Sequence, residues 1–230
     1  MNVIEHALKQ GRQSLSEYDA KRFLSGFGIP VCREILVSDP ESAASRALDI
    51  GFPVVLKASG AKLLHKTEVG GVALNLKSEQ EVRDEARRLL RIPNCEGLLV
   101  QEMVKGDREL VCGLIRDAHL GACVMCGLGG IFTELLDDVV FRVAPVTLAE
   151  ANDMMAQIRS AKIFAAFRGQ PPVDLQALGS ILVSLGKIGL DYEAVQAIDL
   201  NPVKIRADGM PAVVDALITL GPSAQTIGTQ

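Results

Sequence analysis

Residues 56–72, LKASGAKLLHKTEVGGV, combine three kinds of group that handle phosphate. Lys57 stands at the end of an apolar strand and offers a positive charge to phosphate oxygens. Gly70 and Gly71 let backbone N–H groups approach an anion closely, and His65 offers an imidazole nitrogen that can itself carry a phosphoryl group. Each group alone also fits a structural role, because such lysines often form salt bridges and a Gly-Gly pair often marks a tight turn. Their order within one short segment predicts a phosphate-handling site.

The composition is that of a globular protein, long enough for one large domain or two small ones. The 230 residues are 48% hydrophobic and 23% charged, and no apolar run approaches the roughly 20 residues that span a bilayer. The first residues, MNVIEHALKQGRQ, lack the continuous apolar stretch of a secretory signal. The five cysteines are odd in number and lie in apolar surroundings, which favours reduced core thiols over disulfides. We therefore expect a cytoplasmic protein without a membrane span.

The charges and aromatic residues argue against binding to nucleic acid. The net charge is −4, and the lysines and arginines are dispersed along the chain rather than gathered in a stripe. Seven Phe, two Tyr and no Trp leave few side chains for base stacking. We expect small anions or another protein as partners. Cys123 and Cys126 have the spacing of a CxxC motif, but without a second pair they favour buried thiols over a metal or redox site.

Helices and short apolar strands alternate along the chain, which indicates an α/β protein with mixed sheets. Ser or Thr followed three residues later by Glu predicts four helix starts, and a fifth helix is predicted from Asp174 to near Gly189. Hairpin-length links at residues 105–107 and 206–211 argue against a wholly parallel sheet. The capping pairs are Ser14/Glu17, Ser38/Glu41, Ser78/Glu81 and Thr147/Glu150, and the strands are 31–37, 53–58, 72–76, 98–103, 109–116, 122–125, 139–143, 194–200, 203–206 and 212–214.

Two further groups of residues suggest a nucleotide and a metal ion. Residues 101–104, Gln101, Glu102, Met103 and Val104, end an apolar strand whose backbone can pair with an adenine, and Glu109 can accept from ribose hydroxyls. The alternative is that Glu102 and Glu109 are solvated hairpin charges. Asp199, Asn201 and Asp215 offer oxygen ligands of the kind that Mg²⁺ prefers. A turn cap would explain Asn201 but not Asp215 in an otherwise apolar strand.

Five blocks, in order, resemble one known family. They are residues 17–30 EYDAKRFLSGFGIP, 51–72 GFPVVLKASGAKLLHKTEVGGV, 98–110 LLVQEMVKGDREL, 126–145 CGLGGIFTELLDDVVFRVAP and 197–215 AIDLNPVKIRADGMPAVVD. The chain resembles the ATP-grasp β subunit of ADP-forming acyl-CoA synthetases, the acetate–CoA ligase group related to succinyl-CoA synthetase. The resemblance covers roughly residues 16–220.

The resemblance implies a two-subdomain ATP-grasp fold, with each subdomain of the α+β kind and ATP or ADP held between them. The expected layout is an N-terminal helix or arm at 1–14, the ATP-grasp domain at 15–220 with a hinge near 101–109, and a flexible tail at 221–230. It implies that Lys57, Gly70, Gly71, residues 101–104 and Glu109 bind the nucleotide. Asn201 and Asp215 are then the Mg²⁺ ligands. Glu134, with Asp138 and Arg142, is expected near the catalytic centre.

His65 is the histidine that the resemblance marks for phosphorylation, with Asp199 beside the travelling group. Acyl-CoA, phosphate and ADP would give a carboxylic acid, CoA and ATP. A CoA-binding alpha subunit with its own phosphorylatable histidine is implied as the partner, in a hetero-oligomer for which α2β2 is one candidate stoichiometry. The family commonly has Ser-Pro before the histidine and Ser-Asp after it, where this chain has Ser59-Gly60 and Thr67-Glu68.

Two other functions fit parts of this pattern. A stand-alone ATP-grasp carboxylate–amine ligase would activate its own acid and would not need His65. A non-catalytic nucleotide-binding module would lack a working metal site. Neither alternative accounts for His65, so the acyl-CoA synthetase subunit is the preferred interpretation.

Overall fold

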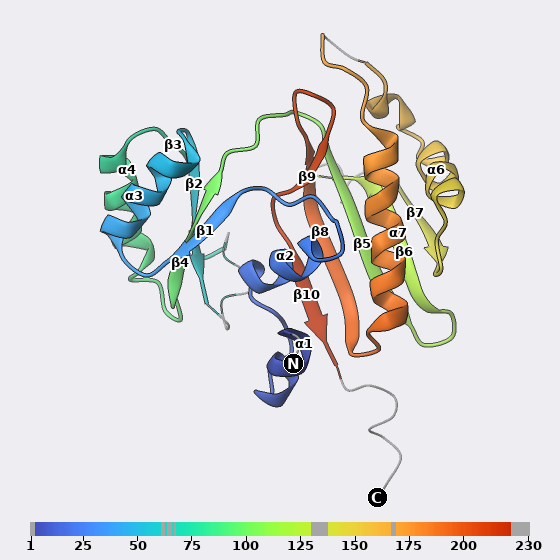
Figure 1. Cartoon of the computed structure of the whole chain (residues 1–230), viewed down its shortest axis with the longest axis horizontal. Coiled ribbons are helices and arrows are strands. Elements are labelled where there is room, and N and C mark those ends of the chain that lie inside the picture. The colour runs from blue at the N-terminus through green and yellow to red at the C-terminus, as the bar shows by residue number, and fades with distance from the viewer. Residues whose placement is uncertain are drawn as a thin grey trace, which may run out of the picture. The chain divides into compact units, whose positions relative to one another are not determined.

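The chain folds into two compact units (Figure 1). The structure is a computed structural model that describes residues 3–60, 63, 66, 68–129, 138–166 and 169–221. Unit 1 comprises Met1–Leu15, Asp19–Val31 and Lys105–Gln230, and unit 2 comprises Ser16–Tyr18 and Cys32–Val104. None of the described helices is long and apolar enough to cross a membrane.

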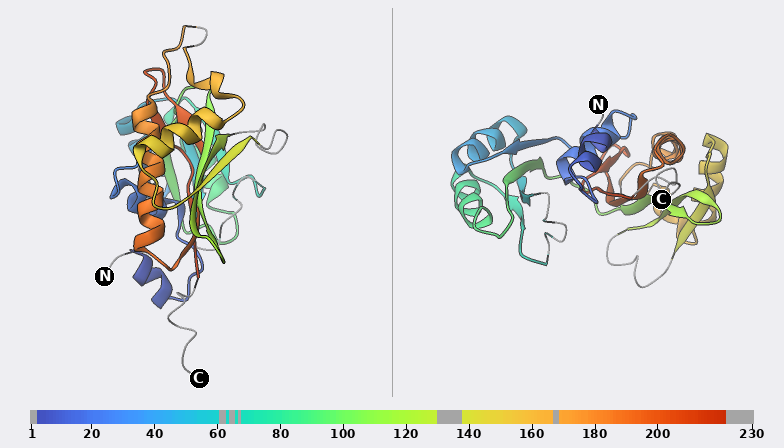
Figure 2. Two further views of the ribbon diagram at one scale, coloured as in Figure 1. Left: turned by 90° about the vertical axis from the view of Figure 1, so that its right-hand side faces the viewer. Right: turned by 90° about the horizontal axis from the view of Figure 1, so that it is seen from below.

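Unit 2 is a four-stranded antiparallel sheet with two helices on one face (Figure 2). Val54, Leu56 and Ala58 point from the sheet into the core beneath the helices, and Lys57 points to the opposite face because strand residues alternate. We call the face opposite the helices the far face. In the order β1-β4-β2-β3, the strands are β1 (Glu34–Val37), β4 (Gly97–Glu102), β2 (Val54–Ser59) and β3 (Val72–Leu76), and the helices are α3 (Pro40–Ile50) and α4 (Glu79–Leu89).

Unit 1 is a six-stranded antiparallel sheet that packs one face against helices. The strand order is β10-β8-β5-β6-β7, with β9 paired to β8. The strands are β5 (Glu109–Asp117), β6 (Gly121–Leu128), β7 (Val139–Val143), β8 (Val195–Ile205), β9 (Pro211–Val213) and β10 (Leu217–Leu220). The helices are α1 (Val3–Lys9), α2 (Glu17–Ser25), whose first residues belong to unit 2, α6 (Leu148–Gln157), η2 (Ala161–Phe164) and α7 (Leu175–Asp191).

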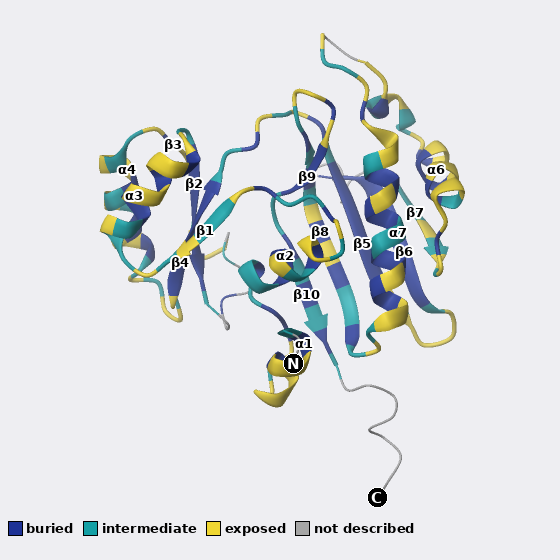
Figure 3. Cartoon of the chain, in the orientation of Figure 1, coloured by how far each residue is buried: buried dark blue, intermediate teal, exposed yellow. Residues whose placement is uncertain are grey.

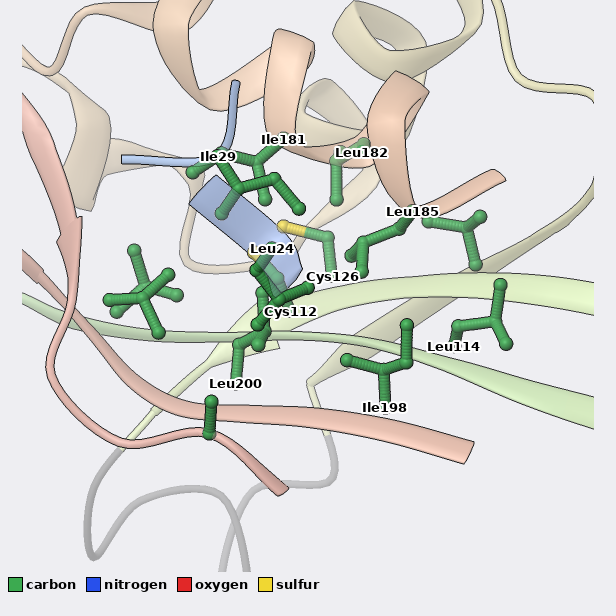
Figure 4. Close-up of a cluster of buried hydrophobic side chains, with 14 of the residues drawn as sticks. Leu24, Ile29, Cys112, Leu114, Cys126, Ile181, Leu182, Leu185, Ile198 and Leu200 are labelled. Atoms are coloured by element: carbon green, nitrogen blue, oxygen red, sulfur yellow. The ribbon is translucent and has the colours of Figure 1, made fainter. Parts of the chain in front are cut away.

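The core of unit 1 lies between α7 and the sheet (Figure 4). Leu182 and Leu185 of α7 share this core with Leu114 and Ile198. Figure 3 shows buried positions interspersed with less buried ones along β8, whereas β5 is buried over most of its length. Gly189 was predicted to end the helix, but α7 continues to Asp191. A Cβ at Gly189 would lie 2.5 Å from Cδ1 of Leu114, so this glycine lets the helix approach the sheet closely.

Three predicted helix starts are confirmed by side-chain caps. Thr147 and Glu150 form a complete capping box at α6. The side chain of Ser78 accepts from the N–H of Glu81 at α4, and Asp174 caps α7. These residues satisfy N–H groups that the first helical turn leaves without partners.

Two other predicted starts are displaced. The pair beginning at Ser38 is shifted by one residue, because the side chain of Asp39 caps α3. Ser14 forms an isolated bridge with Thr219 instead of capping a helix, and α2 begins at Glu17. Glu17 is therefore available for a different contact.

The segment 105–107 does not form the predicted hairpin, because β4 and β5 belong to different sheets. Gly106 lies against β8, where a Cβ would approach the carbonyl oxygen of Ile205 to 2.1 Å. Lys204 Nζ also donates to the carbonyl oxygen of Gly106 at 3.2 Å. The second predicted hairpin is confirmed, since β8 and β9 pair with Ile205 opposite Pro211. The predicted strands 194–200 and 203–206 are one strand, β8, and β10 was not predicted.

The cysteines are free thiols, as predicted. Cys123 and Cys126 lie three residues apart on β6 and so point to opposite faces, which prevents them from sharing a metal ion. Cys126 lies in the core opposite Cys112, and a hydrogen bond between them, together with burial, raises the pKa of Cys112 well above its ordinary value.

Asp138 anchors the segment that follows α6. Its carboxylate accepts from the N–H of Arg159 at 2.8 Å and from the N–H of Ser160 at 2.9 Å, and the residue is 5% exposed. Burial acts to raise the pKa of Asp138, but the hydrogen bonds outweigh it and the pKa lies below its ordinary value. The carboxylate therefore has a structural role.

Asp138→Ala should lower the free energy of unfolding by about 1–2 kcal/mol at pH 7, since two backbone N–H groups lose their acceptor. A lowered pKa means that this contribution is present above the ordinary pKa of 3.8 and is lost as the pH falls through the folded-state value. Urea unfolding of both proteins between pH 7 and pH 3 measures the difference. Asp153→Ala, at an exposed residue of α6, is the control. A difference that stays constant with pH would contradict this role.

Candidate functional site

Lys57 lies on the far face of the unit 2 sheet, within a cluster of three charged side chains. Its strand, β2, is buried along its whole length and pairs with β3 and β4 on either side. Lys57 Nζ lies 2.7 Å from Oε1 of Glu17, and Lys66 Nζ contacts Oε2 of the same carboxylate. The side chains of Glu17, Lys57 and Lys66 are 1%, 7% and 12% exposed. One buried carboxylate thus joins two ammonium groups, one of them next in sequence to His65.

Gly70 and Gly71 close the chain back onto β2. Gly70 has a φ of 65°, which favours glycine, and its carbonyl oxygen accepts from Arg88 at 2.9 Å. The N–H of Gly71 donates to the carbonyl oxygen of Lys66 at 2.6 Å, and the N–H of Ala58 donates to the carbonyl oxygen of Gly71 at 2.8 Å. In this structure the N–H of Gly71 therefore closes a turn, while its predicted role toward an anion remains a prediction.

Two of the predicted catalytic residues, His65 and Glu134, lie outside the described residues. Their roles stay predictions. The other two histidines occupy exposed positions: His6 is hydrogen-bonded to Gln10 within 2.8 Å, and His119 lies in the turn after β5.

The predicted adenine-binding segment, residues 101–104, comprises the last two residues of β4 and the two residues that follow it. Gln101 faces the same side of the sheet as Lys57, and its backbone lies in register with both β1 and β2. The side chain of Glu102 accepts from the N–H of Arg33 at 2.7 Å. Of these four residues, Met103 and Val104 lie beyond the ladder, and the role of the segment toward a base stays a prediction.

Glu109, predicted to bind ribose, is paired across the sheet of unit 1. It lies opposite Lys204 of β8, with 3.0 Å between Oε1 and Nζ. Both side chains are partly exposed, at 32% and 24%. Exposed pairs of this kind contribute little to stability, so the contact does not prevent Glu109 from binding a ligand.

Asp199 and Asn201 project from the far face of the unit 1 sheet. Their neighbours Ile198 and Leu200 point into the core, and strand alternation directs Asp199 the other way. The pairing of β8 with β5 is irregular where Asn201 lies, because Leu200 and Val203 are both in register while the residues between them are not. Such irregularities turn a side chain out of the regular ladder and are common near active sites.

Asp215 lies between β9 and β10 and interacts electrostatically with Asp199. Asp199 reaches solvent, but its surroundings exclude enough water to raise its pKa, and the negative charge of Asp215 raises it further. The described residues contain no cluster of three or more His, Cys, Asp or Glu suited to a metal ion. The carboxylates of Asp199 and Asp215 and the amide oxygen of Asn201 are ligand types that Mg²⁺ accepts, and their role as a metal site stays a prediction.

Arg142 does not lie on the sheet face that carries Asp199. It lies opposite Val124, a core residue, so it points to the face of the sheet that the helices cover. There its charge acts on Glu150 of α6 and contributes to lowering the pKa of that carboxylate, after the hydrogen bonds from Thr147. With Asp138 capping Arg159 and Ser160, neither residue lies on the face that carries Asp199.

Sequence reasoning missed Glu17 and Lys66. Glu17 was assigned to a capping box because it follows Ser14 by three residues, and that interpretation concealed its buried contact with Lys57. Lys66 was considered only as a neighbour of His65. The available signal was that Glu17, an acidic residue, begins the block 17–30, which precedes the block that contains Lys57.

Comparison with known proteins supports the fold and the family. A family model for the ATP-grasp domain matches residues 6–220. The beta subunit of acetate–CoA ligase [ADP-forming] I from Pyrococcus furiosus is 37% identical over 92% of this chain and 94% of its own length. The acetate–CoA ligase [ADP-forming] I of Archaeoglobus fulgidus is 37% identical over 95% of this chain, which corresponds to 33% of that longer protein.

Solved structures agree with these relatives. Acetyl-coenzyme A synthetase 1 from Ca. Korarchaeum cryptofilum, in complex with coenzyme A and Ca-AMPCP, is 42% identical with a TM-score of 0.90, covering 95% of this chain and 98% of that chain. A second structure of that enzyme, with coenzyme A and Mg-AMPPCP, has a TM-score of 0.84, and its phosphohistidine segment points towards the nucleotide-binding site.

The ATP-grasp fold expected from the resemblance is therefore confirmed, as is the resemblance itself. The relatives that match nearly end to end are ADP-forming ligases, and they match as beta subunits. Since the domain model and these relatives cover almost the whole chain, it belongs to the ATP-grasp beta subunits of ADP-forming acetate–CoA ligases.

Proposed function

We propose that His65 of this beta subunit carries a phosphoryl group between a CoA-binding partner and Mg-ADP. The Korarchaeum relative, 42% identical over 95% of this chain, has a phosphohistidine segment that turns towards its nucleotide site. Among the three histidines here, His65 alone lies in the phosphate-handling stretch. This placement is the observation that carries the proposal.

The overall reaction converts acyl-CoA, phosphate and ADP into a carboxylic acid, CoA and ATP. The partner forms the acyl phosphate and passes the phosphoryl group through its own histidine. A neutral imidazole nitrogen of His65 then attacks phosphorus, forming a P–N bond as the donor's bond breaks. In the final step a β-phosphate oxygen of ADP attacks the phosphohistidine, so that the P–N bond breaks and ATP forms.

The remaining residues position the nucleotide and offset its charge. Lys57 attracts the transferring phosphoryl group, and Gly70 and Gly71 shape the chain beside it. Gln101, Glu102, Met103 and Val104 bind the base through their backbone groups. The carboxylate of Glu109 accepts hydrogen bonds from the ribose hydroxyls. Phosphoryl transfer depends mainly on such positioning and electrostatics. Glu134 and Asp199 act near the transferring phosphoryl group.

Asn201 and Asp215 are proposed to hold Mg²⁺, which when bound neutralises phosphate charge. Their oxygen donors support this role, as does the mutual repulsion of Asp199 and Asp215, which a cation would relieve. The partner is proposed to be an alpha subunit, because the Pyrococcus relatives are separate beta subunits and the Archaeoglobus relative is a much longer chain. The five free cysteines support a cytoplasmic location.

Labelling with γ-labelled ATP and Mg²⁺ tests the carrier. Wild type should acquire acid-labile, base-stable label, and both His65→Ala and His65→Asn should abolish it, since neither side chain is a nucleophile under these conditions. His6→Ala and His119→Ala, at the two exposed histidines, should keep the label. Nucleotide binding without label, even with the partner present, would favour a carboxylate–amine ligase or a binding module.

Asn201→Ala and Asp215→Asn test the metal ligands. Each should raise the Mg²⁺ concentration needed for ADP binding by about tenfold or more, because a ligand oxygen or its charge is lost. Calorimetric titration of ADP at several Mg²⁺ concentrations measures this. Asp208→Asn, in the β8–β9 turn of the same unit, is the matched control. An unchanged Mg²⁺ requirement in both variants would remove these residues from the metal site.

A further inference from the structure

The carboxylate of Glu17 is the most buried member of the charged cluster on unit 2. Its two oxygens are divided between two cations, with Oε1 toward Lys57 and Oε2 toward Lys66. Lys57 belongs to the fully buried strand β2, which is paired on both sides, whereas Lys66 belongs to the connection between β2 and β3. Glu17 therefore links the connection that contains His65 to the strand that presents the phosphate-binding lysine.

The main chain holds Lys66 at the same place by a second route. Its carbonyl oxygen accepts from the N–H of Gly71, whose own carbonyl oxygen accepts from the N–H of Ala58 on β2. A Cβ at Gly71 would lie 2.9 Å from the carbonyl oxygen of Lys66, so glycine is needed for this approach. The residue after His65 is thus tied to β2 through both its backbone and its side chain.

We propose that Glu17 is a positioning residue for phosphoryl transfer, acting through Lys66 and Lys57. The proposal rests on the proposed role of His65. By holding Lys66 beside Lys57, Glu17 fixes one end of the histidine segment relative to the ammonium group that attracts the phosphoryl group. Small displacements of reacting groups slow such transfers strongly, because rate depends on alignment of the attacking atom.

The charge of Glu17 makes the proposal distinguishable from a purely structural role. A carboxylate that pairs with Lys57 competes with phosphate for the same ammonium group. Its removal cannot weaken the electrostatic attraction of Lys57 for nucleotide phosphates, whereas local unfolding would weaken nucleotide binding. Loss of positioning therefore slows transfer without loss of affinity, and loss of structure lowers both.

The experiment uses the full chain with γ-labelled ATP and Mg²⁺ in a quenched-flow instrument. During labelling the γ-phosphoryl group leaves the β-phosphate oxygen of ATP and forms a P–N bond with His65, releasing ADP. Glu17→Gln should lower the rate constant of labelling at saturating ATP by about tenfold to a hundredfold. Its Kd for Mg-ATP should be unchanged or lower than that of wild type.

Lys66→Gln serves as a second variant in case Glu17→Gln fails to fold, because it leaves the Glu17–Lys57 pair in place. It should also slow labelling, and Glu17→Gln/Lys66→Gln should be no slower than the slower single variant, since both residues act through one contact. Glu41→Gln is the matched control: Glu41 also accepts from a cation at 2.7 Å, here Arg83, but on the exposed surface of the same unit. It should label at the wild-type rate.

Labelling of Glu17→Gln and Lys66→Gln at the wild-type rate would overturn the positioning role and leave the carrier function intact. A parallel loss of labelling rate, nucleotide affinity and Tm in Lys66→Gln would also overturn it, in favour of a structural role. Absence of label in wild type itself would overturn the carrier function, and the role of Glu17 with it.

Discussion

Strand alternation combined with one-sided helix cover determines where chemistry can occur in this protein. In each unit the helices bury one face of an antiparallel sheet, so every second residue of a central strand belongs to the core. The intervening residues point to the far face, away from the core beneath the helices. Lys57 in unit 2 and Asp199 in unit 1 both follow this rule, because their immediate strand neighbours are core residues.

The same constraint separates the candidate site residues from structural residues that resemble them in sequence. Arg142 and Asp138 stand in a block shared with the family, yet the register of β7 points Arg142 toward α6, and Asp138 caps the chain after that helix. Cys123 and Cys126 have the spacing of a metal motif, but on a strand that spacing divides them between two faces. Spacing is informative only once the period of the element is known.

Sequence patterns between neighbouring residues predicted several helices and strands correctly. They did not predict contacts between residues that are far apart in the sequence. The boundaries of β3 and β7 and the capping box at Thr147 were predictable, because alternation and capping depend on neighbours in sequence. The path of residues 105–107 was not, since Gly106 lies against β8, whose residues Lys204 and Ile205 are far away in sequence. For the candidate site, residue types on the far faces were predictable from motifs. The bridging role of Glu17 was not, because its partners are 40 and 49 residues away.

The charged cluster at Glu17 is better explained by geometry than by stability. Removing charged groups from water is costly, and well-packed apolar side chains often stabilise a fold as much as a buried ion pair does. A carboxylate that is shared between two lysines, however, specifies a distance between two chain segments that apolar packing leaves less defined. Here one of those segments presents Lys57 and the other continues directly from His65. The cost of burying Glu17 is therefore offset by alignment, which is the property on which phosphoryl transfer depends.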